Sequence, residues 1–319
     1  MILTGLALLL AAVLGERAYY LKNRGFSISK IVSSKPSVKS QVPPEVDSLL
    51  NQSFHFIGAG GTSFVFLGDD KKTILKLFKH HQLYFKHSLF HLAFPAPCDA
   101  WRIKKILLRE KEHRHKRHHF FFNSCQLAFN ELKEETGLIY FCSSPNPHFD
   151  GDVLLYDAWG IPHTLHLSQT EFALQKRATL LFPHLKALIE QRREEEAKKA
   201  IDAFLAIIVT RCKKGIGDRD PNLRINFGFV DGKAIEFDLG SYYSDPSLKN
   251  LSNTAREAFF MTIALQKWLE NLSPELSRYL LQQIASIHRD AAGCKNEDAD
   301  EASGQFLNHD VYTNAEVVS

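Results

Sequence analysis

The chain has 319 residues, of which 45% are hydrophobic and 24% are charged, and its formal net charge is +3 at pH 7. A chain of this size can bury a sizeable core, and its small net charge excludes a generally basic surface, which argues against nucleic acid as a partner. Its five cysteines are odd in number and form no C-x-x-C pair, which argues against a disulfide framework or a structural zinc site and favours a reducing compartment.

The N-terminal segment predicts a membrane anchor or an export signal. Residues 2–15 are all apolar or small, and Arg17, Lys22 and Arg24 follow them. As a helix this run would reach about 21 Å, which is short of the roughly 30 Å hydrocarbon core, so the anchor would be marginal. Positive residues after the run favour a cytoplasmic location for the following domain, and a cleaved signal that exports the chain is the alternative.

Two runs of β-branched and aromatic residues, 56–67 and 73–78, predict a β-hairpin around the polar turn 68–72. The first run contains the glycine-rich stretch 58–63, and the second contains Lys76. Glycines let a backbone approach phosphate oxygens closely, and an ammonium group on a stiff strand can reach the same phosphates. By itself, the glycine-rich stretch is more typical of an ordinary tight turn between strands, and Lys76 is more typical of a solvated surface lysine.

The stretch 102–119 is rich in Lys, Arg and His and has only Glu110 and Glu112 as acids. It predicts a solvated helix inserted before the next helix, or a surface that contacts anionic lipid. Apolar residues at helical spacing then predict a helix over 124–135, and a strand is predicted directly after it, over 138–141.

A second strand pair is predicted at 152–157 and 164–167, and helical patterns follow from about 170 to 212. Acidic residues three or four places before basic ones over 190–199 indicate an exposed helical face. The apolar run 203–209 predicts a buried helix that leads to the next motif.

Three polar residues then follow at short spacings. Asp220 is followed six residues later by Asn226, and Asp238 comes after a short apolar strand. This spacing resembles the catalytic and metal loops of the protein-kinase-like superfamily, in which phosphoryl transfer uses a carboxylate to orient the attacking hydroxyl, and an Asn and a second carboxylate to hold Mg²⁺ on the phosphates. Each of these residues could alone be a turn former or a helix cap.

In this order, the motifs resemble those of the protein-kinase-like superfamily, in its compact, atypical branches. Gly58, Gly60 and Val65 fall on the glycine-rich loop pattern, Ser63 stands where its third Gly is expected, and Lys76 stands where the phosphate-contacting Lys is expected. The resemblance covers about residues 50–290 in a few short blocks.

The resemblance implies an α+β, bilobed, protein-kinase-like fold with a small β-rich N-lobe and a mostly helical, shortened C-lobe. The implied layout is an anchor or signal at 1–24, a flexible linker at 25–49, an N-lobe at about 50–168, a C-lobe at about 169–290 and a disordered acidic tail at 291–319.

The resemblance also implies ATP and Mg²⁺ as cofactors and assigns residue roles. Asn226 and Asp238 would bind the metal, and Glu131 would pair with Lys76. Asp220 or Asp218 would be the catalytic base; Asp220 is preferred because Arg219 precedes it as the family's Arg does.

The departures from the family leave two functions open. Asp218 replaces the His of His-Arg-Asp, the step from Asp220 to Asn226 is one residue longer than usual, and no Ala-Pro-Glu signature follows. The first function is a phosphotransferase whose acceptor is an unknown protein or small molecule. The second is a membrane-tethered pseudokinase that keeps the fold, and with it nucleotide binding or a scaffold role, without turnover.

Overall fold

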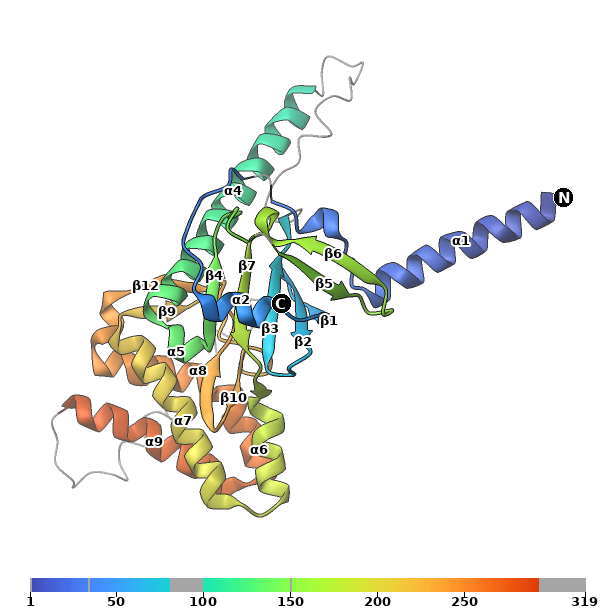
Figure 1. Cartoon of the computed structure of the whole chain (residues 1–319). Helices are drawn as coiled ribbons and strands as arrows, with labels where there is room; N and C mark the ends of the chain where they lie inside the picture. The colour runs from blue at the N-terminus through green and yellow to red at the C-terminus, as the bar shows by residue number, and fades with distance from the viewer. Residues whose placement is uncertain (1, 34, 81–99, 150, 293–319) are drawn as a thin grey trace. The chain divides into compact units, whose positions relative to one another are not determined.

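The computed structural model describes residues 2–33, 35–80, 100–149 and 151–292. The chain divides into two compact units: a first unit of residues 1–177 with 239–241, and a second unit of residues 178–238 with 242–319. The predicted α+β class is confirmed, because the first unit is built on a seven-stranded sheet and the second unit is mostly helical (Figure 1).

The first unit is built on a seven-stranded sheet in the order β4-β7-β3-β2-β1-β5-β6. Its strands are β1 (Phe54–Ala59), β2 (Ser63–Gly68), β3 (Thr73–Phe78), β4 (Leu138–Cys142), β5 (Asp152–Tyr156), β6 (Pro162–His166) and β7 (Phe172–Lys176). Neighbouring strands are antiparallel except β1 and β5, which run parallel. The predicted β2–β3 hairpin and β5–β6 pair are both confirmed.

The two faces of β3 carry different side chains. Leu75 and Leu77 belong to the apolar core of the first unit. Phe78 points to the opposite face because side chains alternate along a strand. There its ring packs edge-on against Phe121 and Phe122 of α4 (Ala100–Glu131), with centroids 5.2 and 5.6 Å apart.

The prediction of a flexible linker at 25–49 is wrong. This stretch includes the short helices η1 (Ile28–Lys30) and α2 (Pro44–Leu50). Phe26, Ile31 and Val46 are buried in the core of the first unit. Apolar residues spaced through a Ser- and Lys-rich background supply this burial, and average composition does not reveal it.

The N-terminal segment forms α1 (Ile2–Lys22). Within the described residues, no helix is both long enough and apolar enough to cross a membrane. Anchoring and the alternative of a cleaved signal stay predictions.

The basic stretch 102–119 and most of the helix predicted at 124–135 form one continuous helix, α4, followed by α5 (Lys133–Thr136). The predicted helix over the basic stretch is therefore present, and it continues without a break into the helix predicted at 124–135. Lys105 and Arg109 are exposed, and Lys116 pairs with Glu112 at 2.8 Å, as expected of a solvated helix. Lipid contact by this stretch stays a prediction.

The second unit is mostly helical. Its helices are α6 (Leu181–Glu190), α7 (Glu194–Lys213), η4 (Pro246–Lys249), α8 (Leu251–Leu272) and α9 (Pro274–Ala292). Its strands are β8 (Thr179–Leu180), β9 (Ile216–Asp218), β10 (Phe227–Val230), β11 (Lys233–Glu236) and β12 (Tyr242–Ser244), in one sheet ordered β11-β10-β8 and a second pairing β12 with β9. The buried helix predicted at 203–209 is confirmed, because Phe204, Leu205 and Ile208 of α7 lie in the core.

Two boundaries differ from the sequence prediction. Residues 170–180 are not helical, because β7 fills a central place in the sheet of the first unit and is buried on both faces, and β8 follows it. A strand buried on both faces lacks the alternation that distinguishes it from a helix. The predicted disordered tail lies outside the described residues, apart from 291 and 292 at the end of α9.

Candidate functional site

The loop between β9 and β10 of the second unit carries Asp220 and Asn226. The backbone N–H of Asp220 donates to Oδ1 of Asp218 at 3.0 Å, and Nδ2 of Asn226 donates to the carbonyl oxygen of Asp220 at 2.9 Å. A tight turn, in which the N–H of Asn226 donates to the carbonyl of Asn222 at 2.9 Å, takes up the extra residue of this loop. The longer step therefore still joins Asn226 to Asp220.

Asp238 lies close to this loop. The backbone N–H of Phe237, its neighbour, donates to the carbonyl oxygen of Asn226 at 2.8 Å. Partial desolvation of its carboxylate raises the pKa of Asp220, and the charges of Asp238 and Asp218 raise it further. The second unit thus brings together all four of its predicted site residues.

Asn226 and Asp238 fit a magnesium ion. Asn226 is buried, and its amide nitrogen is engaged by Asp220, which turns the amide oxygen to the other side. Oxygen ligands from one or two side chains suit Mg²⁺, which keeps water and phosphate oxygens in its remaining positions. Among the residues that the structure describes, no group of three or more His, Cys, Asp and Glu side chains could hold a metal ion.

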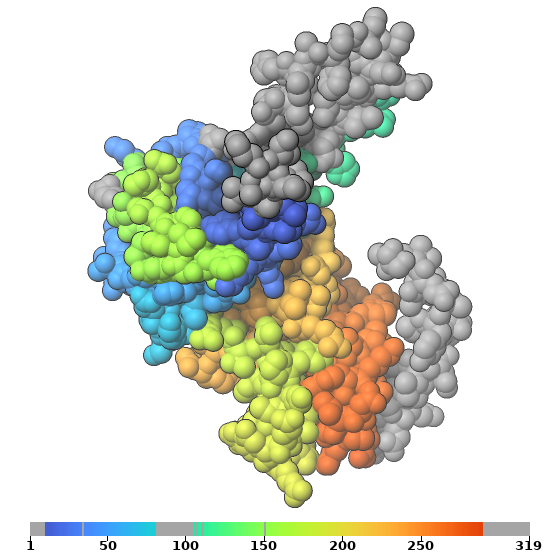
Figure 2. All heavy atoms as spheres, turned by 90° about the vertical axis from the view of Figure 1, so that its right-hand side faces the viewer, coloured from blue at the N-terminus to red at the C-terminus, as the bar shows by residue number. Residues whose placement is uncertain are grey.

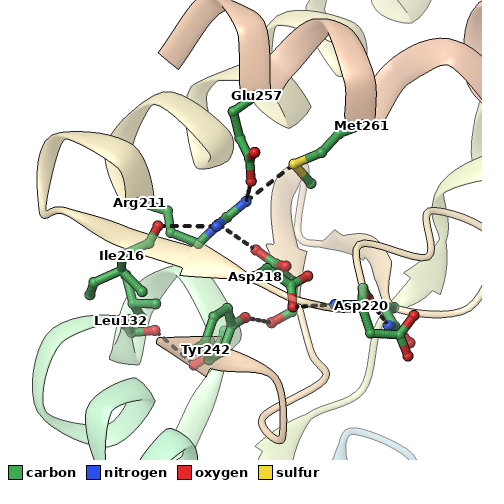
Figure 3. A network of polar contacts seen from close by, with 11 residues as sticks. Leu132, Arg211, Ile216, Asp218, Asp220, Tyr242, Glu257 and Met261 are labelled. Atoms are coloured by element: carbon green, nitrogen blue, oxygen red, sulfur yellow. Dashed lines mark hydrogen bonds and ion pairs between the residues drawn. The ribbon is translucent and has the colours of Figure 1, made fainter. Parts of the chain in front are cut away.

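A buried arginine lies beside the loop (Figure 3). Arg211 of α7 is 0% exposed, and its Nη1 donates to the carbonyl oxygen of Ile216 at 3.0 Å. Its guanidinium pairs with Glu236 of β11 at 3.3 Å and with Glu257 of α8 at 3.4 Å. Arg211 therefore links α7, β9, β11 and α8.

Glu236 and Asp218 share this buried environment. Glu236 is 1% exposed and Asp218 is 7% exposed. Burial raises the pKa of Glu236 well above its usual value, Arg211 acts against this rise, and Asp218 adds to it. Because Asp218 is buried in this network while Asp220 is exposed, the geometry favours Asp220 as the residue that meets a substrate.

Sequence reasoning missed Arg211 and Glu236. Arg211 continues the spacing of Ile207 and Ile208 on the buried face of α7, and Glu236 ends the short strand before Asp238. A charge within an apolar pattern is the signal that could have identified both.

In the first unit, the glycine-rich stretch forms the turn between β1 and β2. The N–H of Gly60 donates to the carbonyl oxygen of Ser63 at 2.9 Å, and a register shift lies between Phe56 and Gly58. A Cβ added at Gly58 or Gly60 would meet nothing within 4 Å. Neither protein packing nor a left-handed backbone therefore explains these two glycines.

Lys76 and Val65 lie directly opposite each other in the β2–β3 pair, so their side chains share one face of the sheet. This is the face on which Phe78 meets α4. A second lysine, which sequence reasoning missed, supports the glycine turn: Nζ of Lys79 donates to the carbonyl oxygen of Gly60 at 2.6 Å. Burial lowers the pKa of Lys79.

Glu131 is the last residue of α4, and its side chain is exposed. The part of α4 that packs on β3 lies about ten residues earlier, roughly 15 Å along the helix, at Phe121 and Phe122. One turn beyond those rings, Oγ of Ser124 donates to the carbonyl oxygen of Leu239 at 2.6 Å. The pairing of Glu131 with Lys76 stays a prediction.

No protein-family model matches the chain, and no curated protein matches it. Two crystal structures of WbdD, one of them described as a bifunctional kinase-methyltransferase, are similar at 15% and 14% identity with TM-scores of 0.31 and 0.30. They cover 77% of this chain and 48% and 47% of WbdD, so the chain spans about half the length of that protein. A likeness this weak carries no argument about the fold or the residue roles of this chain.

Proposed function

We propose that the chain is an ATP- and Mg²⁺-dependent phosphotransferase with a bilobed, protein-kinase-like fold. The observation that carries the proposal is the hydrogen bond from the side chain of Asn226 to the backbone carbonyl of Asp220. The charge of Asp238 also raises the pKa of the Asp220 carboxylate. The bond supports a metal ligand and a base held at a fixed separation, which phosphoryl transfer needs.

In this mechanism Asp220 orients the acceptor hydroxyl and takes its proton. Its raised pKa makes it a stronger base than an ordinary surface aspartate. Mg²⁺, when bound, would neutralise charge on the phosphate oxygens, and Asn226 and Asp238 would hold it. Lys76 and the open backbone at Gly58 and Gly60 would contact phosphates. This role would explain why glycine stands at these two positions, where packing does not require it.

Nucleotide binding is the first property to test. The full chain is the right sample, because Phe26 and Ile31 belong to the core of the first unit. A shorter chain that begins near residue 45, at the start of the kinase-like region, would lack both. The melting temperature should rise with Mg·ATP, and Asp238→Asn should lose most of that rise. An unshifted melting curve in the parent would refute nucleotide binding.

The second candidate is a pseudokinase that binds nucleotide without turnover. Ser63 in place of the third glycine and Asp218 in place of the family's His favour it. Asp220→Ala should stop ATP consumption and keep the Mg·ATP melting shift if the chain is an enzyme. A parent with the shift but with no turnover above that of Asp220→Ala, across protein and small-molecule acceptors, would identify the pseudokinase.

A further inference from the structure

Five large apolar side chains of the first unit are substantially exposed to solvent. Along α1, Leu10, Leu14 and Leu21 are 60%, 57% and 65% exposed. At the turn between β5 and β6, Trp159 and Ile161 are 48% and 46% exposed. Leu10, Leu14, Leu21, Trp159 and Ile161 are together called the apolar surface below.

Asp157 fastens α1 to this turn. Its Oδ2 accepts hydrogen bonds from Tyr19 Oη at 2.7 Å and from Asn23 Nδ2 at 3.1 Å. Its Oδ1 accepts from the backbone N–H groups of Trp159 at 2.8 Å and Ile161 at 3.0 Å. One buried carboxylate therefore holds the end of α1 and shapes the turn that presents Trp159 and Ile161.

Further contacts strengthen this junction. The N–H of Ala158 donates to Oδ1 of Asn23 at 2.8 Å, and the ammonium of Lys22 lies 4.0 Å from the ring centre of Trp159. Figure 1 shows the C-terminal end of α1 meeting the sheet beside β5 and β6, and Figure 2 shows the dark-blue residues of α1 next to the green hairpin. The turn and the end of α1 thus form one element of the fold.

Basic side chains accompany the apolar surface. Arg17, Lys22 and Arg24 are exposed near the end of α1, with Glu16 as the acid among them. An aromatic ring beside lysines and arginines at the end of an apolar helix is the composition found where a membrane meets water. Such cations also attract anionic headgroups.

We propose that the apolar surface docks into the headgroup region of an anionic lipid bilayer, with α1 entering from one side. The sequence has only apolar or small residues over 2–15, whereas a helix that binds a protein partner needs only one apolar stripe. The exposed cations Arg17, Lys22 and Arg24 stay at the surface with Trp159 and Ile161. The run that enters would reach about 21 Å, so the chain docks without crossing.

The test is co-sedimentation of the full chain with vesicles of phosphatidylcholine alone and with added phosphatidylglycerol. The parent should bind the anionic vesicles more tightly, and salt should weaken that preference. Trp159→Ala should lower the vesicle affinity by about tenfold, because the exposed half of the indole ring is no longer available to be buried in the bilayer. Lys22→Glu should lower the affinity for the anionic vesicles and leave the affinity for phosphatidylcholine vesicles unchanged.

Phe260→Ala is the matched control, because Phe260 is an aromatic residue that is 53% exposed on α8 of the second unit. Its vesicle affinity should equal that of the parent. The Mg·ATP melting shift of Trp159→Ala should also equal the parent shift, which separates this proposal from the proposed function.

Three outcomes would overturn the proposal. The first is vesicle binding that is equal in the parent and in a folded Trp159→Ala variant. The second is a stable dimer in solution that Leu14→Asp dissociates, which would assign the apolar surface to a second copy of the chain. The third is a chain from its native cell that lacks residues 1–15 by intact mass, which would show that α1 is removed.

Discussion

Each unit buries a charged side chain, and the two are stabilised differently. Burial acts to raise the pKa of Asp157 in the first unit, but hydrogen bonds from Tyr19 and from backbone N–H groups bring it down to about 2. In the second unit Arg211 pairs with two acids, and burial raises the pKa of Glu236. Hydrogen-bond donors stabilise the charged form of Asp157, whereas the charged form of Glu236 is stabilised by the nearby cation of Arg211.

This difference separates a structural fastening from a support for chemistry. Hydrogen bonds around Asp157 hold one conformation of a turn and a helix end. The acids around Arg211 include Asp218, whose Oδ1 accepts the backbone N–H of Asp220. A substitution of Arg211 should therefore disturb the conformation of the candidate catalytic loop, whereas a substitution of Asp157 should not.

The largest expected effect is that of Arg211→Met. Removing the guanidinium leaves Glu236 buried without its cation, and breaking a buried pair costs about 3–5 kcal/mol of the free energy of unfolding. Urea denaturation at pH 7 measures this loss.

Lys267→Met is the control, because Lys267 is an exposed base on α8 and should change stability little. The double variant Arg211→Met, Glu236→Leu should regain part of the loss, because apolar side chains can replace a buried ion pair. A cost below about 1 kcal/mol for Arg211→Met would show that the ion pair is unimportant.

The next effect depends on pH. The pKa of Asp157 is lowered from 3.8 to about 2, so its contribution to stability is complete above the unfolded value and is lost as the pH falls through the folded value. The shift corresponds to about 2 kcal/mol at pH 7.

Asp157→Asn should therefore be less stable than the parent at pH 7, and the gap should narrow steadily between about pH 4 and pH 2. Asp152→Asn is the control, because Asp152 is an exposed acid at the start of β5, the strand that precedes Asp157. Melting temperatures of the three proteins across this range measure the effect. A gap that stays constant with pH would exclude the ionised carboxylate as its source.

These two buried charges also mark what sequence can and cannot predict here. The β2–β3 hairpin was predictable because strand alternation and a polar turn are local, and the spacing of Asp220, Asn226 and Asp238 is a local motif. Asp157 meets Tyr19 across 138 residues, and Arg211 meets Glu257 across 46. No local pattern pairs such residues, and the turn that accommodates the longer loop before Asn226 is likewise visible only in three dimensions.

Glycines extend the comparison between the units. A Cβ on Gly228 of β10 would lie 2.5 Å from the backbone oxygen of Thr179 in the neighbouring β8. Backbone cannot move as a side-chain end can, so Gly228→Ala should cost about 1–2 kcal/mol of stability through overpacking. Thermal unfolding measures the cost, and a variant as stable as the parent would show that β8 can move away.

The smallest expected effect on stability is that of Gly60→Ala, where a Cβ would meet nothing within 4 Å and the backbone is not left-handed. Stability should stay the same or rise by up to about 1 kcal/mol, because alanine restricts the unfolded chain. If the open space beside Gly60 receives phosphate, the same variant should lose much of the Mg·ATP melting shift. Gly61→Ala is the matched control, since Gly61 is equally open but lies off the glycine-rich pattern. Equal shifts in the two variants would mean that the turn does not bind phosphate, and the openness of Gly60 would then need another explanation.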